Sequence, residues 1–214
     1  DVETCPQLRS RLDKILNVPQ RVRFRSSLAC GLAGDSFEHP ARGVIVLVHT
    51  RRSINSEVPF TYAMLELKNI NAYYGESHIL RNVAFTIDPG EVVCLMGRNG
   101  VGKTTTLKVL TGLLPARSGQ LIFDGADITK EATDRRARRG LAYVPQGREI
   151  IPHLTVKQNL QLGFWARSDK ANGTVEKTAF EEVYHLFPKL TQILNRPGGV
   201  LSGGEQQQLA IGRA

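Results

Sequence analysis

The feature that most constrains this sequence is the glycine-rich stretch Gly97–Thr104, which reads GRNGVGKT. It fits the pattern G-x-x-x-x-G-K-[ST], in which glycines let the N–H groups of a loop turn towards phosphate oxygens. The apolar run Val92–Met96 precedes it, as expected for a short buried strand. Leu107, Leu110 and Leu114 follow it at helical spacing. The order of strand, glycine loop and helix predicts an α/β fold with a phosphate-binding site.

Positions in this loop have distinct chemical roles. Lys103 is expected to place its charge on the β- and γ-phosphates, and the Thr104 hydroxyl to bind Mg²⁺. The helix that starts here adds unpaired N–H groups and a partial positive charge. A glycine-rich turn that matches by accident is the alternative, but the flanking elements make such a coincidence rare. The predicted nucleotide-binding residues of the loop are Gly97, Arg98, Asn99, Gly100, Val101, Gly102, Lys103, Thr104 and Thr105.

A second glycine-containing stretch, Leu201–Glu205, begins another apparent helix near the C-terminal end. Alone, Ser-Gly-Gly before a helix is a common N-cap, although its hydroxyl and N–H groups can also bind an anion. Together with the phosphate loop, it resembles the LSGG signature motif of ATP-binding cassette (ABC) ATPases. The resemblance implies that these residues cap a nucleotide held by a second cassette. They are Ser202, Gly203, Gly204 and Glu205.

Two further positions match the same family. Tyr74 precedes Gly75 where the family keeps an aromatic residue that stacks on adenine; Tyr73 competes for this role, and packing on a sheet is the structural alternative. Gln146 resembles the Q-loop glutamine, which reaches Mg²⁺ and the attacking water, with a surface turn as the alternative. The resemblance therefore implies Lys103 and Gln146 as catalytic residues, and Thr104 and Gln146 as metal ligands.

The resemblance covers residues 64–214 and implies a P-loop NTPase (RecA-like) core with an antiparallel β subdomain and a helical lobe. Leu65 and Leu67 alternate as in a strand, Asp124-Gly125 fits a hairpin turn, and residues 147–201 fit the helical lobe. Within the family, the sequence is most similar to the smaller ATPase of branched-chain amino acid importers. Its stretches Gly97–Thr105 and Tyr143–Ile150 favour the urea-importer ATPase of that group.

The ends of the sequence depart from the family pattern. No apolar run ending in Asp-Glu is present, and all five histidines precede the signature motif. We therefore expect the C-terminal part of the core to be missing, with the Walker B Asp, the catalytic Glu and the switch His. This fragment alone should hydrolyse little ATP, because phosphoryl transfer depends on placing the attacking water. Residues 1–63 match nothing in the family; we expect translated upstream sequence with no folded role, and a small regulatory extension is the rival.

The charge balance is basic, with 28 Lys and Arg against 20 Asp and Glu. Such a balance can indicate nucleic acid or an anionic membrane surface. The densest cluster, Arg135–Arg139, reads as a solvated helix face, and without interleaved aromatic residues we expect no nucleic-acid binding. Three widely spaced cysteines without C-x-x-C fit a reducing cytoplasm, with Cys94 as a core residue. No metal other than Mg²⁺ is implied.

The resemblance therefore implies an ATP-binding subunit of an ABC importer that hydrolyses ATP to drive uptake of branched-chain amino acids or urea. Its expected partners are a second cassette, identical or related, and membrane permeases contacted through residues 147–164. Its expected location is the cytoplasmic face of the inner membrane. A truncated, non-catalytic remnant is the main alternative, and an ABC protein of translation or repair is a weaker one.

Overall fold

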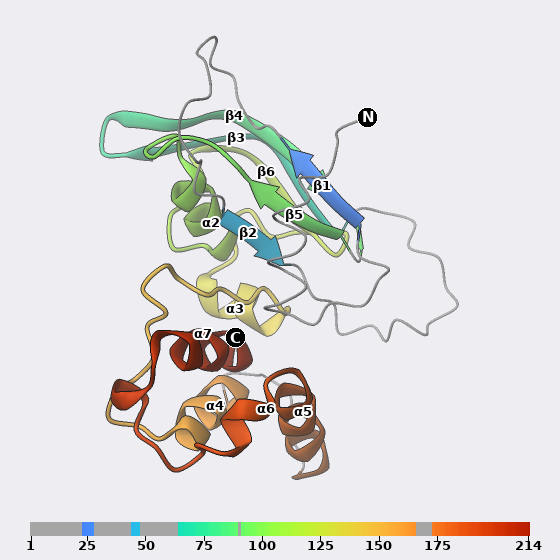
Figure 1. Ribbon diagram of the computed structural model, residues 1–214. Coiled ribbons are helices and arrows are strands. Elements are labelled where there is room, and N and C mark those ends of the chain that lie inside the picture. Colours follow the sequence, from blue (N-terminus) through green and yellow to red (C-terminus); the bar gives the residue numbers. More distant parts are fainter. Residues whose placement is uncertain (1–22, 28–43, 48–63, 90, 166–172) are drawn as a thin grey trace. The chain divides into compact units, whose positions relative to one another are not determined.

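The computed structural model describes residues 23–27, 44–47, 64–89, 91–165 and 173–214 (Figure 1). The chain forms two compact units, one up to Leu141 and one from Ala142. The first unit holds the sheets and the phosphate loop, and the second is helical, so the predicted fold class is confirmed. Among the described residues, none of the helices is both long and apolar enough to cross a membrane.

The first unit contains a four-stranded antiparallel sheet in the order β4-β3-β6-β7. Its strands are β3 (Leu65–Tyr74), β4 (Ser77–Ile87), β6 (Ser118–Phe123) and β7 (Ala126–Asp127). Leu65 and Leu67 are buried on one face, as their alternation predicts. Asp124 and Gly125 have φ values of 48° and 75° and form the predicted turn between β6 and β7.

A second, three-stranded sheet is built around β5 (Glu91–Leu95), the strand predicted from the apolar run before the phosphate loop. It pairs in parallel with β1 (Arg23–Ser27) and antiparallel with β2 (Val44–Leu47). Cys94, predicted to be a core residue, is half-buried there, and burial raises the pKa of its thiol. The rest of the predicted extension, residues 1–63, lies outside the described residues, so its role stays a prediction.

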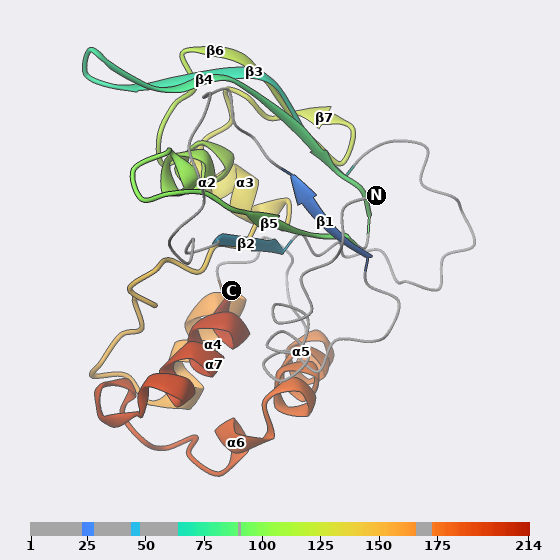
Figure 2. The same cartoon turned by 45° about the horizontal axis from the view of Figure 1, so that its top comes forward.

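Two helices complete the first unit. Helix α2 (Lys103–Thr111) starts at the phosphate loop, and α3 (Thr133–Arg138) lies beside it (Figure 2). The buried residues of α2 join the strands in one hydrophobic core, where Val109 and Leu110 are 2% exposed. Because this core fixes both β5 and α2, the loop that joins them is held at its two ends.

The second unit has its own hydrophobic core, to which loop residues such as Phe187, Ile193 and Leu201 contribute along with the helices. The helices are α4 (Val156–Trp165), α5 (Gly173–Leu186), α6 (Pro188–Thr191), the short 3₁₀ helix η1 (Gly198–Val200) and α7 (Gly203–Arg213). Helices α4 and α7 lie side by side (Figure 2), and Leu160 and Leu209 are buried in this core. A helical second unit is what residues 147–201 led us to expect.

Candidate nucleotide-binding site

The phosphate loop connects β5 to α2 through a backbone that only glycine adopts readily. Gly100 and Gly102 have φ values of 86° and 98°, in the left-handed region. At Gly102 a side chain would also collide with its surroundings, since a Cβ there would lie 2.7 Å from Cδ2 of the buried Leu80. The conformation predicted from the motif is therefore present, and it is tied to the packing of β4.

The side chains around the loop give it a positive character. The Lys103 ammonium donates to the carbonyl oxygens of Gly97 and Arg98 at 2.6 and 2.7 Å, so it lies back over the loop. The first turn of α2 carries no acidic residue, which leaves the positive end of its dipole unopposed. The Lys103 ammonium and the start of α2 form an arrangement suited to an anion with several charged oxygens.

The next positions of the helix divide into an exposed hydroxyl and two buried ones. Thr105 and Thr106 are 7% and 5% exposed, and the Thr106 hydroxyl donates to the Gly102 carbonyl at 3.0 Å. Thr104 is exposed at the start of α2. Its hydroxyl oxygen is the kind of hard ligand that Mg²⁺ prefers, so the residues present fit a magnesium ion bound together with phosphates.

Two neighbouring tyrosines at the end of β3 have different surroundings. The ring of Tyr73 is stacked on His78, with centroids 4.1 Å apart, and the guanidinium of Arg117 lies 4.8 Å from its centroid. Tyr74 is 44% exposed, and the Lys108 ammonium from α2 lies 5.7 Å from the centroid of its ring. Tyr74 thus contacts α2 and is partly exposed, while Tyr73 is engaged by His78 and Arg117.

The far end of α2 is held by Arg136, which the sequence did not single out. Its cluster was predicted to be a solvated helix face, and this is wrong for Arg136, which is 3% exposed. Its guanidinium donates to the carbonyls of Val109, Leu110, Glu131 and Thr129 at 2.6 to 2.9 Å. Burial lowers its pKa. Four backbone acceptors explain why an arginine is tolerated here, and no local sequence pattern encodes them.

In the second unit, the signature residues form the start of α7. Ser202 is its N-cap: the Ser202 Oγ accepts from the Glu205 N–H at 3.4 Å, and the Glu205 carboxylate accepts from the Ser202 N–H at 2.8 Å. The latter bond lowers the pKa of Glu205. Ser202, Gly203 and Gly204 are exposed. The Glu205 carboxylate, predicted to contact a nucleotide, is thus engaged by the helix backbone.

The predicted Q-loop residue Gln146 is exposed in a loop of the second unit. Shortly after it, Arg148 and Glu149 have φ values of 63° and 47°. Arg148 Nη1 donates to the Gln206 Oε1 at 3.0 Å, and Arg213 Nη2 donates to the Glu149 carbonyl at 2.8 Å. Helix α7 therefore holds this loop through its first and last turns. Because the partners lie far apart in sequence, no local motif indicates these bonds.

The predicted site residues fall into the two units. The phosphate loop and Tyr74 belong to the first, and Gln146 and the signature residues belong to the second, so the structure describes two separate parts of the predicted site. Within the described residues, no group of three or more His, Cys, Asp or Glu side chains is arranged to hold a metal ion. Thr104 and Gln146, the two predicted Mg²⁺ ligands, belong to different units.

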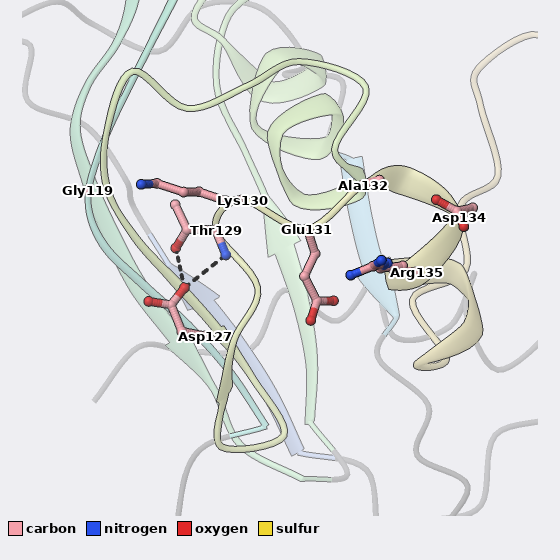
Figure 3. A pocket seen from close by; sticks show the side chains of 8 residues that line it. All are labelled: Gly119, Asp127, Thr129, Lys130, Glu131, Ala132, Asp134 and Arg135. Atoms are coloured by element: carbon pink, nitrogen blue, oxygen red, sulfur yellow. Dashed lines mark hydrogen bonds between the residues drawn. The ribbon is translucent and has the colours of Figure 1, made fainter.

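The first unit also has an open depression of about 810 Å³ at its surface, away from the predicted site residues. Its charged side chains of both signs belong to the segment after β6 and to α3 (Figure 3). In it, the Thr129 hydroxyl and N–H donate to the Asp127 carboxylate at 2.6 and 2.9 Å (Figure 3). These bonds, with one from Gln120, lower the pKa of Asp127 to about 2. The Asp127 carboxylate in this depression is thus engaged by neighbouring residues.

Comparison with known proteins agrees with this geometry. The ABC transporter family model matches residues 80–214. The chain is 38% identical over 151 residues to the high-affinity branched-chain amino acid transport ATP-binding protein BraG of Pseudomonas aeruginosa, covering 71% of this chain and 63% of that protein. It is 36% identical over 151 residues to the probable branched-chain amino acid transport ATP-binding protein LivF of Archaeoglobus fulgidus, covering 71% and 62%.

The fold is also similar to that of a dimeric bacterial ABC transporter cassette, with a TM-score of 0.54 and 26% identity over 70% of this chain and 68% of that one. The chain belongs to the ABC transporter family, and its matched region is an ATP-binding cassette. It spans less than two thirds of the length of the two curated relatives.

Proposed function

We propose that this chain is the ATP-binding subunit of an ABC importer, which binds ATP and hydrolyses it to drive uptake. The observation that carries the proposal is the phosphate loop, where left-handed glycines and Lys103 form an anion cradle at the start of a helix without acidic residues. The relatives named for branched-chain amino acid transport support a transport subunit over a non-catalytic remnant.

In this proposal, each part of the first unit binds one part of the nucleotide. The N–H groups of residues 97–105 and the Lys103 ammonium hold the β- and γ-phosphates. To reach them, Lys103 exchanges its bonds to Gly97 and Arg98 for phosphate oxygens. Thr104 binds Mg²⁺, which offsets phosphate charge when bound. Tyr74, whose ring is partly open, stacks on the adenine.

The second unit serves hydrolysis and the partners. Gln146 orients the attacking water, and Ser202, Gly203 and Gly204 of one cassette contact the nucleotide of another, so we propose a dimer. We place the permease contact in residues 147–164, at the cytoplasmic face of the membrane. Apolar side chains exposed in this range, such as Ile151 and Leu162, support a contact surface there. We propose no nucleic-acid partner.

Two observations favour different transported compounds. The relatives reported above favour branched-chain amino acids, whereas the stretch Tyr143–Ile150 favours urea. We propose branched-chain amino acids, because the relatives match over most of the chain and the stretch is short.

Uptake by the cells that carry the gene tests this function. Deleting the gene should lower the uptake of labelled leucine. Reintroducing the wild-type gene should restore this uptake, whereas reintroducing a gene that encodes Lys103→Ala should not. Lys130→Met, which removes a lysine outside the proposed site, is the control and should restore uptake. Loss of urea uptake instead would reassign the substrate, and unchanged uptake of both compounds would contradict an importer of this group.

A further inference from the structure

Lys108 is a basic side chain beside the proposed nucleotide site for which the phosphate-loop motif does not account. It lies on α2, beyond Lys103, and its ammonium is 5.7 Å from the centroid of the Tyr74 ring. A cation within about 6 Å of an aromatic centroid is attracted by the ring's electron-rich face. Among the described residues, Lys108 has no carboxylate partner, so the ring is the group that its charge faces.

The backbone brings this pair to the edge of the phosphate loop. Ala72 and Tyr74 lie two residues apart on β3, and the pairing with β4 has a register shift between Ala72 and Tyr73. Ala72 is paired with Leu80 on β4, and the Leu80 side chain is the nearest neighbour of Gly102. Tyr74 thus follows closely on the strand pair that packs against the phosphate loop, and α2 brings Lys108 to its ring.

A second cation–tyrosine pair, formed by the neighbouring Tyr73, provides an internal comparison. Arg117 lies 4.8 Å from the Tyr73 centroid, and Tyr73 is also stacked on His78, its pairing partner on β4. Of these two pairs, only that of Lys108 and Tyr74 involves α2, the helix that begins at the phosphate loop. A base attached to phosphates in the loop would therefore meet Tyr74 rather than Tyr73.

We infer that Lys108 is a positioning residue for the nucleotide base, acting through Tyr74. Its ammonium holds the ring from one face and leaves the other face to stack on a purine. The cation also draws electron density from the ring, which favours stacking on an electron-rich purine. This inference rests on the proposed function, because it requires a nucleotide whose phosphates occupy the loop.

The test compares two ligands of the full chain: Mg-ATP, which has a base, and inorganic tripolyphosphate with Mg²⁺, which has none. A general change of the positive field alters the affinity for both ligands. The ratio of the tripolyphosphate dissociation constant to the ATP dissociation constant therefore reports the contribution of the base alone. Lys108→Met should weaken the binding of ATP about threefold relative to the binding of tripolyphosphate, so this ratio should fall. Lys108→Arg keeps a cation and should retain the wild-type ratio, as should the control Lys130→Met, since Lys130 lies outside the site.

A Tyr74→Ala background tests whether Lys108 acts through the ring. There, Lys108→Met should leave the ratio unchanged, because the ring that it positions is gone. If Lys108→Met lowered the ratio below that of the Tyr74→Ala variant, the inference would be overturned, since Lys108 would then contact the nucleotide directly. Lys108→Gln provides a second substitution if Lys108→Met does not fold.

The remaining outcomes separate this inference from the proposed function. If Lys108→Met leaves the ratio unchanged in the otherwise wild-type chain, or shifts it in favour of ATP, the positioning role is wrong while nucleotide binding stands. If the wild-type chain binds neither ATP nor tripolyphosphate, the proposed function fails, and this inference fails with it.

Discussion

At the scale of single residues, Gly102 is subject to the strictest steric demand in the phosphate loop. Its left-handed φ excludes most side chains, and a Cβ would also press on Leu80, which is buried and has little room to move. Gly100 shares the left-handed φ, but a Cβ there would have no neighbour within 4 Å. The two positions therefore separate backbone strain from steric collision.

This difference yields a prediction about the free energy of unfolding in the absence of nucleotide. Gly100→Ala should cost about 1 kcal/mol through backbone strain alone. Gly102→Ala should cost about 3 kcal/mol, because the collision with Leu80 adds an overpacking penalty to the same strain. Denaturant unfolding of both variants measures this difference. Equal costs at the two positions would show that Leu80 yields without penalty.

Asp127 gives a prediction about pH at the same scale. Hydrogen bonds from Thr129 and Gln120 hold its pKa at about 2, below the unfolded value of about 3.9. A lowered folded-state pKa gives stability that is present above the unfolded value and is lost as pH falls through about 2. A carboxyl carbon NMR titration should therefore place Asp127 near pH 2. In the Thr129→Ala variant its pKa should rise towards 3.9; titration near pH 4 in the wild-type chain would contradict the hydrogen bonding.

At the scale of elements, α2 is fixed at its two ends by different means. Its start is set by the phosphate loop, and its last carbonyls accept from the buried guanidinium of Arg136. That guanidinium also bonds to the segment before α3, so it joins the end of α2 to the chain that follows β7. We therefore expect Arg136 to stabilise the unit that carries the phosphate loop.

Replacing this residue should cost considerable stability. Arg136→Met should lower the free energy of unfolding by about 3 kcal/mol, because it leaves buried carbonyls without their charged donor. Arg138→Met is the matched control on the same helix: Arg138 forms an exposed pair with Asp134 at 3.3 Å and should cost less than about 1 kcal/mol. Denaturant unfolding compares them, and similar costs would contradict the structural role of Arg136.

The elements that could be predicted from the sequence are those whose pattern is local. The order of β5, phosphate loop and α2 follows from an apolar run, glycines at fixed spacing and leucines at helical spacing. The roles of Arg136 and Arg148 could not be predicted, because their partners lie in other elements and are backbone carbonyls or glutamines. The difference between Tyr73 and Tyr74 likewise depends on His78, Arg117 and Lys108, which only the fold brings close.

At the scale of the whole molecule, the chain consists of two units, each with its own hydrophobic core. The phosphate loop belongs to the first and the signature residues to the second. The fold and the family were predicted correctly from these two motifs, since each needs only a few neighbouring residues to be recognised. The assignment of residues 1–63 stays a prediction, and so do the roles of the individual site residues.

The central claim, that this phosphate loop binds a nucleotide, is tested most directly by calorimetric titration of Mg-ATP into the full chain. We predict saturable binding of one ATP per chain and at least about a tenfold loss of affinity in Lys103→Ala, corresponding to about 1.4 kcal/mol. Lys130→Met should bind as the wild type does. If the wild-type chain bound no ATP, or if Lys103→Ala bound it equally well, the claim would be contradicted.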